Sequence, residues 1–358
     1  MPERIAVAMS GGLDSSVTAA LLVKRGYDVL GVTMRTWTHN GGRKSPQPAC
    51  CGPDDQEAAR RAARALGIPL FTVDLSREFQ TEVIEYFRQE YLHGRTPNPC
   101  VRCNSLVKFG ALVSGAASLG LDFDWFATGH YARAAHDPAR NRYVLRKGVD
   151  RSKDQSYFLF ALSQETISRL LLPLGDYTKE EVRRLAPALG LSMNGRPESQ
   201  DFSIGDYSSL FGEVESGPIL DRHGNTLGQH RGVPFYTVGQ RKGLGLSLGQ
   251  PMYVTAIRAE DNVIVVGTRE EVRADALVAS QLNWVSIHGL THPIEAGAKI
   301  RYRHREAQAM ISSCGENQVH VAFAEPQTAV TPGQAVVFYH GDEVLGGGII
   351  EHATTHVR

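Results

Sequence analysis

The chain of 358 residues is 42% hydrophobic and 21% charged, and its 38 basic and 38 acidic side chains give no net charge. This composition excludes an intrinsically disordered chain and predicts two or three globular domains. A neutral chain is also unlike the proteins that coat nucleic acid non-specifically, although it can still carry a local basic site.

The five cysteines are an odd number, which does not suit a disulfide framework. No apolar stretch of signal-peptide length follows Met1, and the sequence contains no run of about 18 apolar residues that could span a membrane. We therefore expect a cytoplasmic protein without membrane association, whose cysteines serve catalysis or metal binding.

Short apolar runs alternate with helical patterns in the first part of the chain. The predicted strands cover residues 5–9, 27–34, 69–73 and 125–128, and the predicted helices cover 13–25, 54–66, a segment from Ser76, and 178–190. This alternation predicts an α/β domain over residues 1–205 with a parallel, doubly wound sheet.

Glycine, proline and β-branched residues dominate the rest of the chain. The predicted strands here are 254–257, 263–266, 298–303, 319–323 and 335–339. They predict a small β-rich central domain over residues 206–275 and a C-terminal β-barrel over residues 276–358.

A glycine-rich segment, SGGLDSS at 10–16, lies between the first predicted strand and the first predicted helix. Glycines let the backbone approach an anion, and a helix N-terminus offers N–H groups and positive potential. The segment therefore predicts a phosphate-binding loop, with a simple glycine turn as the alternative. Asp14 in this loop is a candidate metal ligand or helix cap.

The glycine-rich segment resembles that of the PP-loop ATPases, which have an adenine nucleotide alpha hydrolase-like fold. More of the chain resembles the bacterial tRNA 2-thiouridylases within that group, over nearly its whole length. The segments concerned are GVTMRTW at 31–37, CC at 50–51, TPNPCVRCN at 96–104, TGHYA at 128–132, KDQSY at 153–157, GQRKG at 239–243 and GGGII at 346–350.

The resemblance implies that ATP and Mg²⁺ are used and that uridine in tRNA is thiolated. The ATP-binding residues that it implies are Ala8, Met9, Ser10, Gly11, Gly12, Leu13, Asp14, Ser15, Met34 and Gly129. The predicted strands agree with this, since Met34 and Gly129 follow strands whose carboxyl ends would face a ligand. Core packing is the alternative role for Met34.

Cys100 and Cys103 lie in a proline-rich loop just before an apparent helix, where a thiol becomes a better nucleophile. The spacing also allows a redox pair, or half of a zinc site completed by Cys50 and Cys51. We expect the remaining cysteine, Cys314, to be a small buried residue.

By the resemblance, Cys103 attacks a persulfide or carries the sulfur, and Asn98, Pro99 and Cys100 contact the target base. Many family members have Asp where this chain has Cys100. A second departure is Ser203, which occupies the position of the family's second catalytic cysteine and cannot form a persulfide.

Three hypotheses follow from Ser203. Cys100 replaces the missing thiol, so that Cys100 and Cys103 form the sulfur-relay pair. Alternatively, both cysteines bind a [4Fe-4S] cluster with a third ligand that the sequence does not identify. In the third hypothesis, the chain binds tRNA but has lost sulfur transfer.

The segment KIRYRHR at 299–305 holds four Lys and Arg residues and no acid, and seven basic residues lie between Arg133 and Lys153. On a strand, the four cations of 299–305 would share one face and could follow a phosphate backbone, or form an ordinary solvated surface. The tRNA contacts implied by the resemblance are Asn98, Pro99, Cys100, His130, Lys153, Asp154, Gln155, Arg301, Tyr302 and Gln334.

The resemblance thus implies a tRNA-uridine 2-sulfurtransferase that adenylates the C2 carbonyl oxygen of the wobble uridine before sulfur attacks. The resemblance implies lysine, glutamate and glutamine tRNAs as partners, with a cysteine desulfurase or sulfur-relay protein as the sulfur donor. The alternatives are a tRNA-binding homologue without sulfur transfer and a PP-loop ligase that adenylates a small molecule.

Overall fold

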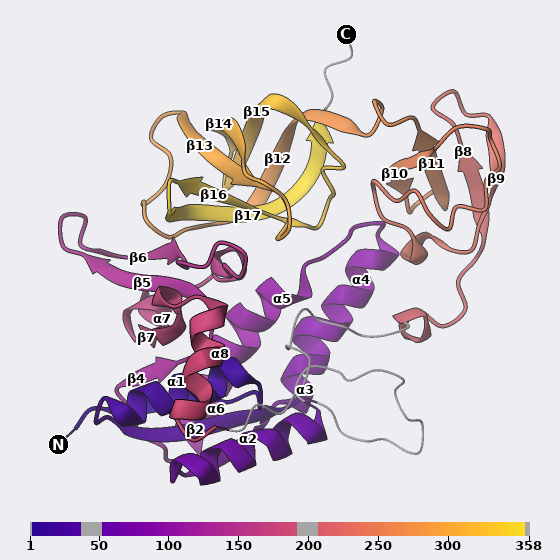
Figure 1. Cartoon of the computed structure of the whole chain (residues 1–358). Coiled ribbons are helices and arrows are strands. Elements are labelled where there is room, and N and C mark those ends of the chain that lie inside the picture. The colour runs from indigo at the N-terminus through magenta and orange to yellow at the C-terminus, as the bar shows by residue number, and fades with distance from the viewer. Residues whose placement is uncertain (1, 37–51, 192–206, 355–358) are drawn as a thin grey trace. The chain divides into compact units, whose positions relative to one another are not determined.

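The computed structural model describes residues 2–36, 52–191 and 207–354, which group into two compact units (Figure 1). Unit 1 contains residues up to 83, residues 100–205 and residues 342–344. Unit 2 contains residues 84–99, residues 206–341 and the chain from 345 onward. The chain therefore passes repeatedly between the two units.

Unit 1 is built on a parallel sheet of five strands in the order β3-β2-β1-β4-β7. The strands are β1 (Arg4–Ala8), β2 (Asp28–Arg35), β3 (Leu70–Asp74), β4 (Trp125–Ala127) and β7 (Leu170–Leu171). The predicted parallel α/β fold is confirmed, since consecutive strands are joined by helices.

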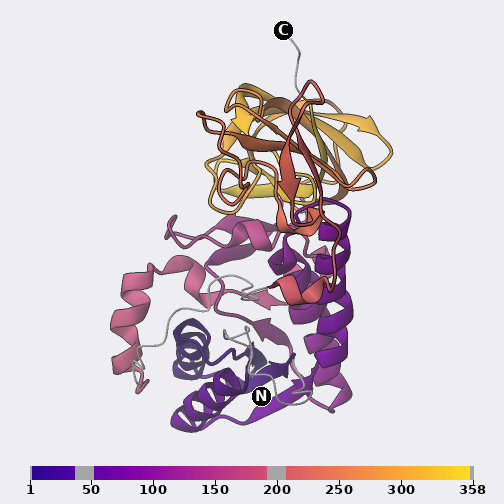
Figure 2. The same cartoon turned by 90° about the vertical axis from the view of Figure 1, so that its right-hand side faces the viewer.

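Helices cover both faces of this sheet. Side chains of α1 (Leu13–Lys24) and α2 (Pro53–Leu66) pack in one core cluster with Ile5 and Leu70, and Figures 1 and 2 show these helices side by side. Val73 points to the opposite face because its position in β3 differs from Leu70 by an odd number of residues. A side chain at Gly115, in α6 (Leu112–Ser118), would touch Val73, so α6 covers that face.

Two helical runs contain wide π-type turns. The first comprises α3 (Ser76–Phe79), the π-type turn Gln80–Glu85 and α4 (Tyr86–Leu92). The second comprises α5 (Pro99–Arg102), the π-type turn Cys103–Ala111 and α6. Such turns often occur at functional sites.

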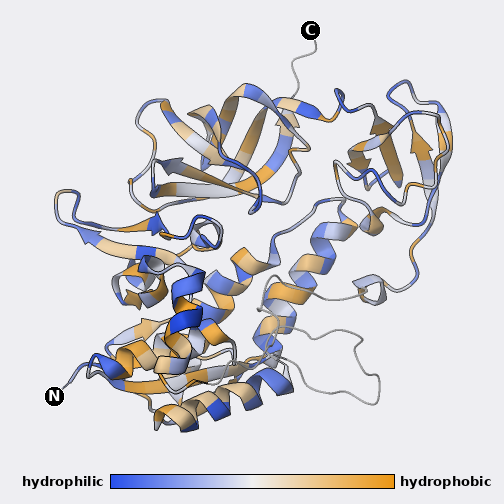
Figure 3. Cartoon of the chain, viewed as in Figure 1, coloured by the Kyte–Doolittle hydropathy of each residue, from blue (hydrophilic) through white to orange (hydrophobic). Residues whose placement is uncertain are grey.

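The remainder of unit 1 contains a hairpin and short helices. These are β5 (Ala132–Asp137), β6 (Arg142–Lys147), the 3₁₀ turns Ser156–Phe158 and Pro173–Asp176, α7 (Gln164–Ser168) and α8 (Lys179–Ala188). The hairpin was not predicted from the sequence. The predicted helix from 178 is confirmed as α8, and Figure 3 shows it as largely hydrophilic.

Unit 2 contains a four-stranded sheet with the order β10-β11-β8-β9. Its strands are β8 (Gly217–Leu220), β9 (Thr226–His230), β10 (Tyr253–Arg258) and β11 (Val263–Gly267), with 3₁₀ turns at Tyr207–Leu210 and Val233–Phe235. An aromatic cluster joins α4 to this region: the ring centroids of Phe87 and Tyr207 are 5.9 Å apart, and those of Tyr91 and Phe211 are 6.1 Å apart.

Six antiparallel strands of unit 2 close into a barrel, because β12 pairs with both β15 and β17. The strands are β12 (Arg273–Trp284), β13 (Ile294–Lys299), β14 (Ala307–Gly315), β15 (Gln318–Thr328), β16 (Ala335–His340) and β17 (Glu343–Thr354). Leu277, Ile311 and Phe338 are fully buried inside it. The predicted C-terminal β-barrel is confirmed.

Two sequence predictions are wrong. Residues 300–303 are not a strand: β13 ends at Lys299 and the chain turns there, with His304 N–H donating to the Arg301 carbonyl at 3.1 Å. Cys314 is exposed rather than buried, because it lies near the end of β14, beyond the strand's buried residues. Within the described residues, no helix has the length and apolar character needed to cross a bilayer.

Candidate active site

The carboxyl ends of β1 and β4 are neighbours, because the two strands pair in parallel with Val7 opposite Ala127. From β1 the sheet extends to β2 and β3 on one side and to β4 and β7 on the other. Ligands of open α/β sheets bind outside the strand ends at such a change of direction. The glycine-rich loop after β1 and the segment after β4 therefore flank a candidate nucleotide site.

The glycine-rich loop has a conformation that depends on Gly11. Its φ is +75°, and a Cβ there would lie 2.1 Å from the carbonyl oxygen of Asp55. The Ser10 N–H donates to Ser15 Oγ at 3.2 Å, and Ser15 Oγ donates to the Gly12 carbonyl at 3.1 Å. Gly12 has no side chain with which to cap α1, which suits binding of an anion by the N–H groups of the first turn.

Three apolar residues in or beside this loop that are predicted to bind ATP, Ala8, Met9 and Leu13, occupy different environments. Met9 is only 2% exposed and belongs to the core, so its predicted ATP contact would involve its main chain. Ala8 ends β1, and Leu13 begins α1 and packs against a separate core cluster. The loop itself therefore supplies the polar groups of the site.

The carboxylate of Asp14 is neither a helix cap nor an isolated charge. Lys179 Nζ donates to both Asp14 oxygens at 2.8 Å, and Tyr131 Oη donates to Asp14 Oδ1 at 2.8 Å. Lys179 is buried, whereas about a third of the Asp14 side chain is exposed, at 30%. An ion pair thus lies directly beside the predicted phosphate site.

Gly129 follows β4 and packs against the start of α1. A Cβ at this position would lie 2.8 Å from the carbonyl carbon of Asp14 and 2.9 Å from the Ser15 nitrogen. Only glycine therefore allows this close approach of two backbones. Met34, the other predicted ATP residue outside the loop, is buried near the end of β2 and pairs with Val73.

His130 is buried between Thr128 and the helical run that carries the cysteines. Its Nδ1 lies 2.7 Å from Thr128 Oγ1, and its Nε2 lies 3.4 Å from Lys108 Nζ. Burial, and secondarily the positive charge of Lys108, hold the pKa of His130 well below its ordinary value of 6.5. A neutral imidazole fits these contacts, because the Lys108 ammonium can only donate to Nε2.

Cys100 and Cys103 lie within the helical run 99–118 and not in a loop before it. Pro99 starts this run, as its fixed φ favours, so both partly exposed cysteines lie in the first turns. Arg102 donates to the Glu82 carbonyl at 2.7 Å and pairs with its carboxylate at 3.1 Å. Lys108 donates to Asn104 Oδ1 at 2.8 Å.

An iron–sulfur cluster or zinc ion needs more ligands than Cys100 and Cys103. Across residues 2–36, 52–191 and 207–354, no group of three or more His, Cys, Asp or Glu side chains is arranged to hold a metal ion. The described residues therefore do not fit such a centre. Cys50, Cys51 and Ser203 lie outside the described residues.

In unit 2, Gln334 contacts the segment that leads to the cysteines. Its side-chain amide donates to the carbonyls of Thr96 at 2.9 Å and Pro97 at 3.1 Å. The Thr96 N–H donates to the Pro332 carbonyl at 2.8 Å. The segment before Asn98 is therefore bound to the loop between β15 and β16.

Arg301 and Tyr302 lie in the turn after β13. The Arg301 guanidinium donates to the Ala329 carbonyl and to Thr331 Oγ1, the latter at 2.9 Å. The Lys299 ammonium lies 5.7 Å from the centroid of the Tyr302 ring. The expected row of four cations on one strand face is therefore wrong, because the segment turns and Arg301 supports the 329–331 loop.

The segment 153–155 supports the residues after β4. Asp154 is buried and accepts hydrogen bonds from Gly148 N–H at 3.0 Å and Ser156 Oγ at 2.9 Å. Gln155 Oε1 accepts from the Tyr131 N–H at 3.0 Å, and Lys153 is partly exposed. The tRNA contacts of these residues and of His130 remain predictions.

Acidic side chains pair with much of the basic stretch between 133 and 153. Arg140 pairs with Glu343 at 2.5 Å and with Asp137 at 2.7 Å. Arg133 and Arg151 both pair with Asp342. Acidic side chains nearby therefore compensate part of the positive charge of this stretch.

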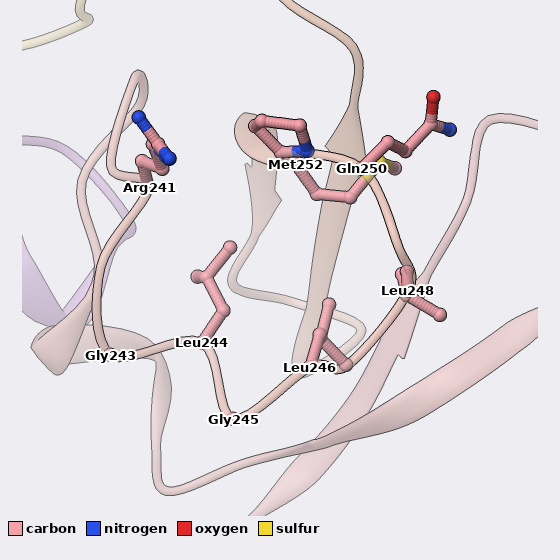
Figure 4. Close-up of a pocket in the computed structure, with 9 residues that line it drawn as sticks. Arg241, Gly243, Leu244, Gly245, Leu246, Leu248, Gln250 and Met252 are labelled. Atoms are coloured by element: carbon pink, nitrogen blue, oxygen red, sulfur yellow. The ribbon is translucent and has the colours of Figure 1, made fainter.

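A pocket in unit 2 involves the later glycine-rich segment (Figure 4). It is lined by residues of one loop, including Arg241, Leu244, Gln250 and Met252. This loop leads into β10 rather than a helix, so it lacks the geometry of a phosphate loop.

Three family descriptions match successive parts of the chain. They are a tRNA methyl transferase HUP domain over residues 3–204, a tRNA methyl transferase PRC-barrel domain over 209–268 and an aminomethyltransferase β-barrel domain over 274–350. The tRNA-specific 2-thiouridylase MnmA of Heliobacterium modesticaldum is 49% identical over 360 residues, covering 98% of this chain and 93% of the relative. The chain belongs to the tRNA-specific 2-thiouridylase family.

Other members of this family are similarly close. The MnmA 1 protein of Caldanaerobacter subterraneus and the MnmA protein of Carboxydothermus hydrogenoformans are each 48% identical over 358 residues, with 98% of both chains covered. The resemblance to the tRNA 2-thiouridylases noted in the sequence is therefore confirmed over nearly the whole chain.

Sequence analysis missed Lys179 as a neighbour of the family's phosphate loop. One signal was present: a lysine at the first position of a helix lies at the positive end of the helix dipole, where a cation is disfavoured. Such a residue suggests an acidic partner elsewhere. The contacts of Lys108 with Asn104 and His130 were missed because they depend on the π-type turn and on β4.

Proposed function

We propose that this chain catalyses ATP-dependent 2-thiolation of the wobble uridine of tRNA. The observation that carries the proposal is the placement, within one compact unit, of a phosphate loop at the sheet's change of direction and of Cys103 at the start of a helical run. Relatives that match 98% of this chain and are about half identical to it are named as tRNA-specific 2-thiouridylases.

The uridine C2 carbonyl is unreactive until its oxygen becomes a leaving group. In our proposal, that oxygen attacks the α-phosphorus of ATP and pyrophosphate departs. The N-terminus of α1 would stabilise the negative charge of the phosphates, and bound Mg²⁺ would supply further positive charge there. Met34 and Gly129, at the ends of β2 and β4, line the adenosine part of the site.

Cysteine-borne sulfur then attacks C2, and AMP leaves with the former carbonyl oxygen. We assign the sulfur to Cys103 and propose that Cys100 replaces the thiol missing at Ser203. In this scheme, Cys103 receives sulfur as a persulfide from a donor such as a cysteine desulfurase or sulfur-relay protein. The Cys100 thiol then attacks the Cys103 sulfur and breaks its bond to the sulfur on C2, which releases 2-thiouridine. A Cys100–Cys103 disulfide remains, and an external thiol reduces it.

We propose that tRNAs for lysine, glutamate and glutamine are the substrates and that both units contact them. The proposed contacts are Asn98, Pro99, Cys100, His130, Lys153, Asp154, Gln155, Arg301, Tyr302 and Gln334. We also propose that the chain has three domains, with the limits 1–205, 206–275 and 276–358. The comparisons do not favour a small-molecule ligase or a tRNA-binding homologue without sulfur transfer.

Nucleoside analysis of tRNA tests this proposal. Unmodified tRNA is incubated with the protein, ATP, Mg²⁺ and a cysteine desulfurase with cysteine. We expect 2-thiouridine with the wild-type chain and none with Cys103→Ser, while Cys314→Ser, an exposed cysteine on the barrel, behaves as the wild type. Unchanged 2-thiouridine with Cys103→Ser would contradict the assignment.

A further inference from the structure

An ion pair connects the phosphate loop to a helix that begins 165 residues later in the sequence. Both carboxylate oxygens of Asp14 accept from Lys179 Nζ at 2.8 Å. The Tyr131 hydroxyl adds a third short hydrogen bond to the same carboxylate. The segments that follow β1 and β4 and the first residue of α8 thus meet at one charged group.

The position of Lys179 is fixed by the start of α8. Thr178 Oγ1 accepts from the Glu181 N–H at 3.2 Å, and the Glu181 carboxylate accepts from the Thr178 N–H at 2.7 Å, which forms a capping box. Val182, one turn further, is buried in a cluster with Val17 of α1. The ammonium therefore has little freedom to leave Asp14.

The pair lies where negative charge would accumulate on ATP binding. Asp14 belongs to the first turn of α1, the same turn whose N–H groups face the loop. A bare carboxylate at this place would repel the phosphates, and the effect would be strong because the site is partly shielded from water. Lys179 neutralises that carboxylate before ATP arrives.

We propose that Lys179 is a positioning residue for ATP: its ammonium neutralises Asp14 and holds it in place, so that the loop accepts a triphosphate. This inference rests on the proposed use of ATP. It concerns nucleotide binding alone, so it can be tested without tRNA and without a sulfur donor.

The test is calorimetric titration of the full chain with ATP and Mg²⁺. Lys179→Met should weaken ATP binding about 10- to 100-fold, because it leaves the negative charge of Asp14 uncompensated beside the phosphates. Lys179→Arg should retain most of the affinity, because it keeps the positive charge. Arg184→Met, which removes an exposed cation from the same helix, should bind ATP as the wild type does.

The double variant Asp14→Asn/Lys179→Met distinguishes an electrostatic effect of Lys179 on ATP binding from a purely structural effect. It removes both charges, so it should bind ATP more tightly than Lys179→Met alone. A structural role alone gives no such recovery. Circular dichroism melts verify folding, and Lys179→Gln, which keeps a donor without charge, repeats the test if the methionine variant unfolds.

Two results would overturn the inference: Lys179→Met binding ATP within about twofold of the wild type, or a double variant that binds no better than the single one. A wild-type chain that binds no ATP would have a different meaning, because it would overturn the proposed function itself.

Discussion

The side-chain amide of Gln334 donates a 2.9 Å hydrogen bond to the carbonyl of Thr96, a residue 238 positions earlier in the chain. The same amide reaches the Pro97 carbonyl. Arg95 strengthens this connection by pairing with Glu351 at 2.7 Å and with Glu90 at 2.8 Å. The barrel of unit 2 therefore holds the segment that precedes the helical run with the cysteines.

Replacement of Gln334 by alanine should destabilise the protein as well as weaken tRNA binding. It removes two partly buried hydrogen bonds, which we expect to cost about 1–3 kcal/mol of unfolding free energy. Gln334→Glu should cost more, because a carboxylate cannot donate to the two carbonyls. Thermal melts without tRNA test this. Gln327→Ala is the control, because the Gln327 amide donates to the nearby Glu325 carbonyl. If Gln334→Ala had the same melting temperature as the wild type, the hydrogen bonds of Gln334 to Thr96 and Pro97 would contribute nothing to stability.

Cys100→Ser should abolish 2-thiouridine formation as completely as Cys103→Ser, if the two thiols form the relay pair. Restoring the family's cysteine with Ser203→Cys in the Cys100→Ser chain should then recover part of the activity. The measurement is nucleoside analysis of tRNA, with Ser203→Cys alone as the control. Full activity of Cys100→Ser would exclude Cys100 from the relay.

His130 should make stability depend on pH in the opposite sense to a histidine paired with an acid. Burial and Lys108 lower its folded-state pKa, so near pH 6 the unfolded chain binds more protons at this residue. Its stabilising contribution is therefore complete above about pH 6.5 and is lost as the pH falls towards the lower folded pKa.

The difference in unfolding free energy between the wild type and His130→Gln measures this contribution. It should change between pH 7.5 and 5.5 by up to about 1.4 kcal/mol per pH unit, the limit for one proton. Denaturant titrations at several pH values give the unfolding free energy of each chain. The contributions of titratable groups that both chains share cancel in the difference. A difference that is constant over this range would contradict a lowered pKa.

Gly129→Ala should impair ATP binding and lower stability. The new methyl group would meet backbone atoms of Asp14 and Ser15 within 3 Å, so the start of α1 must shift, at a cost of about 1–3 kcal/mol. Calorimetry with ATP and a thermal melt report the two effects. Gly110→Ala is the control, since its nearest contact would be 3.3 Å.

The sequence allowed prediction of the parts of the fold that depend on local patterns. The phosphate loop followed from SGGLDSS between an apolar run and a helical pattern, and the capping box Thr178–Glu181 located the start of α8. Family resemblance, rather than a local pattern, is the basis for proposing Cys103, Met34 and Gly129 as site residues. The glycine-rich loop and the capping box are each encoded within a few neighbouring residues.

Features that depend on distant partners could not be predicted in the same way. Asp14 looked like a metal ligand or cap because Lys179, its partner, lies far away in the sequence. Lys299 to Arg305 alternated like a strand, but Arg301 is bonded to the 329–331 loop and the chain turns. The role of Asp342 as a partner of Arg133 likewise required the folded chain.

The grouping of α4 with residues 206–341 has a consequence for synthesis of the chain. Phe87 and Tyr91 are made early, but their ring partners Tyr207 and Phe211 leave the ribosome much later. Until then the aromatic face of α4 is exposed to solvent, and a nascent chain paused near residue 200 presents a surface that chaperones bind. A fragment that ends near residue 205 would lack Tyr207 and Phe211 and would keep this aromatic surface exposed. The N-terminal part of the chain is therefore a poor candidate for separate expression.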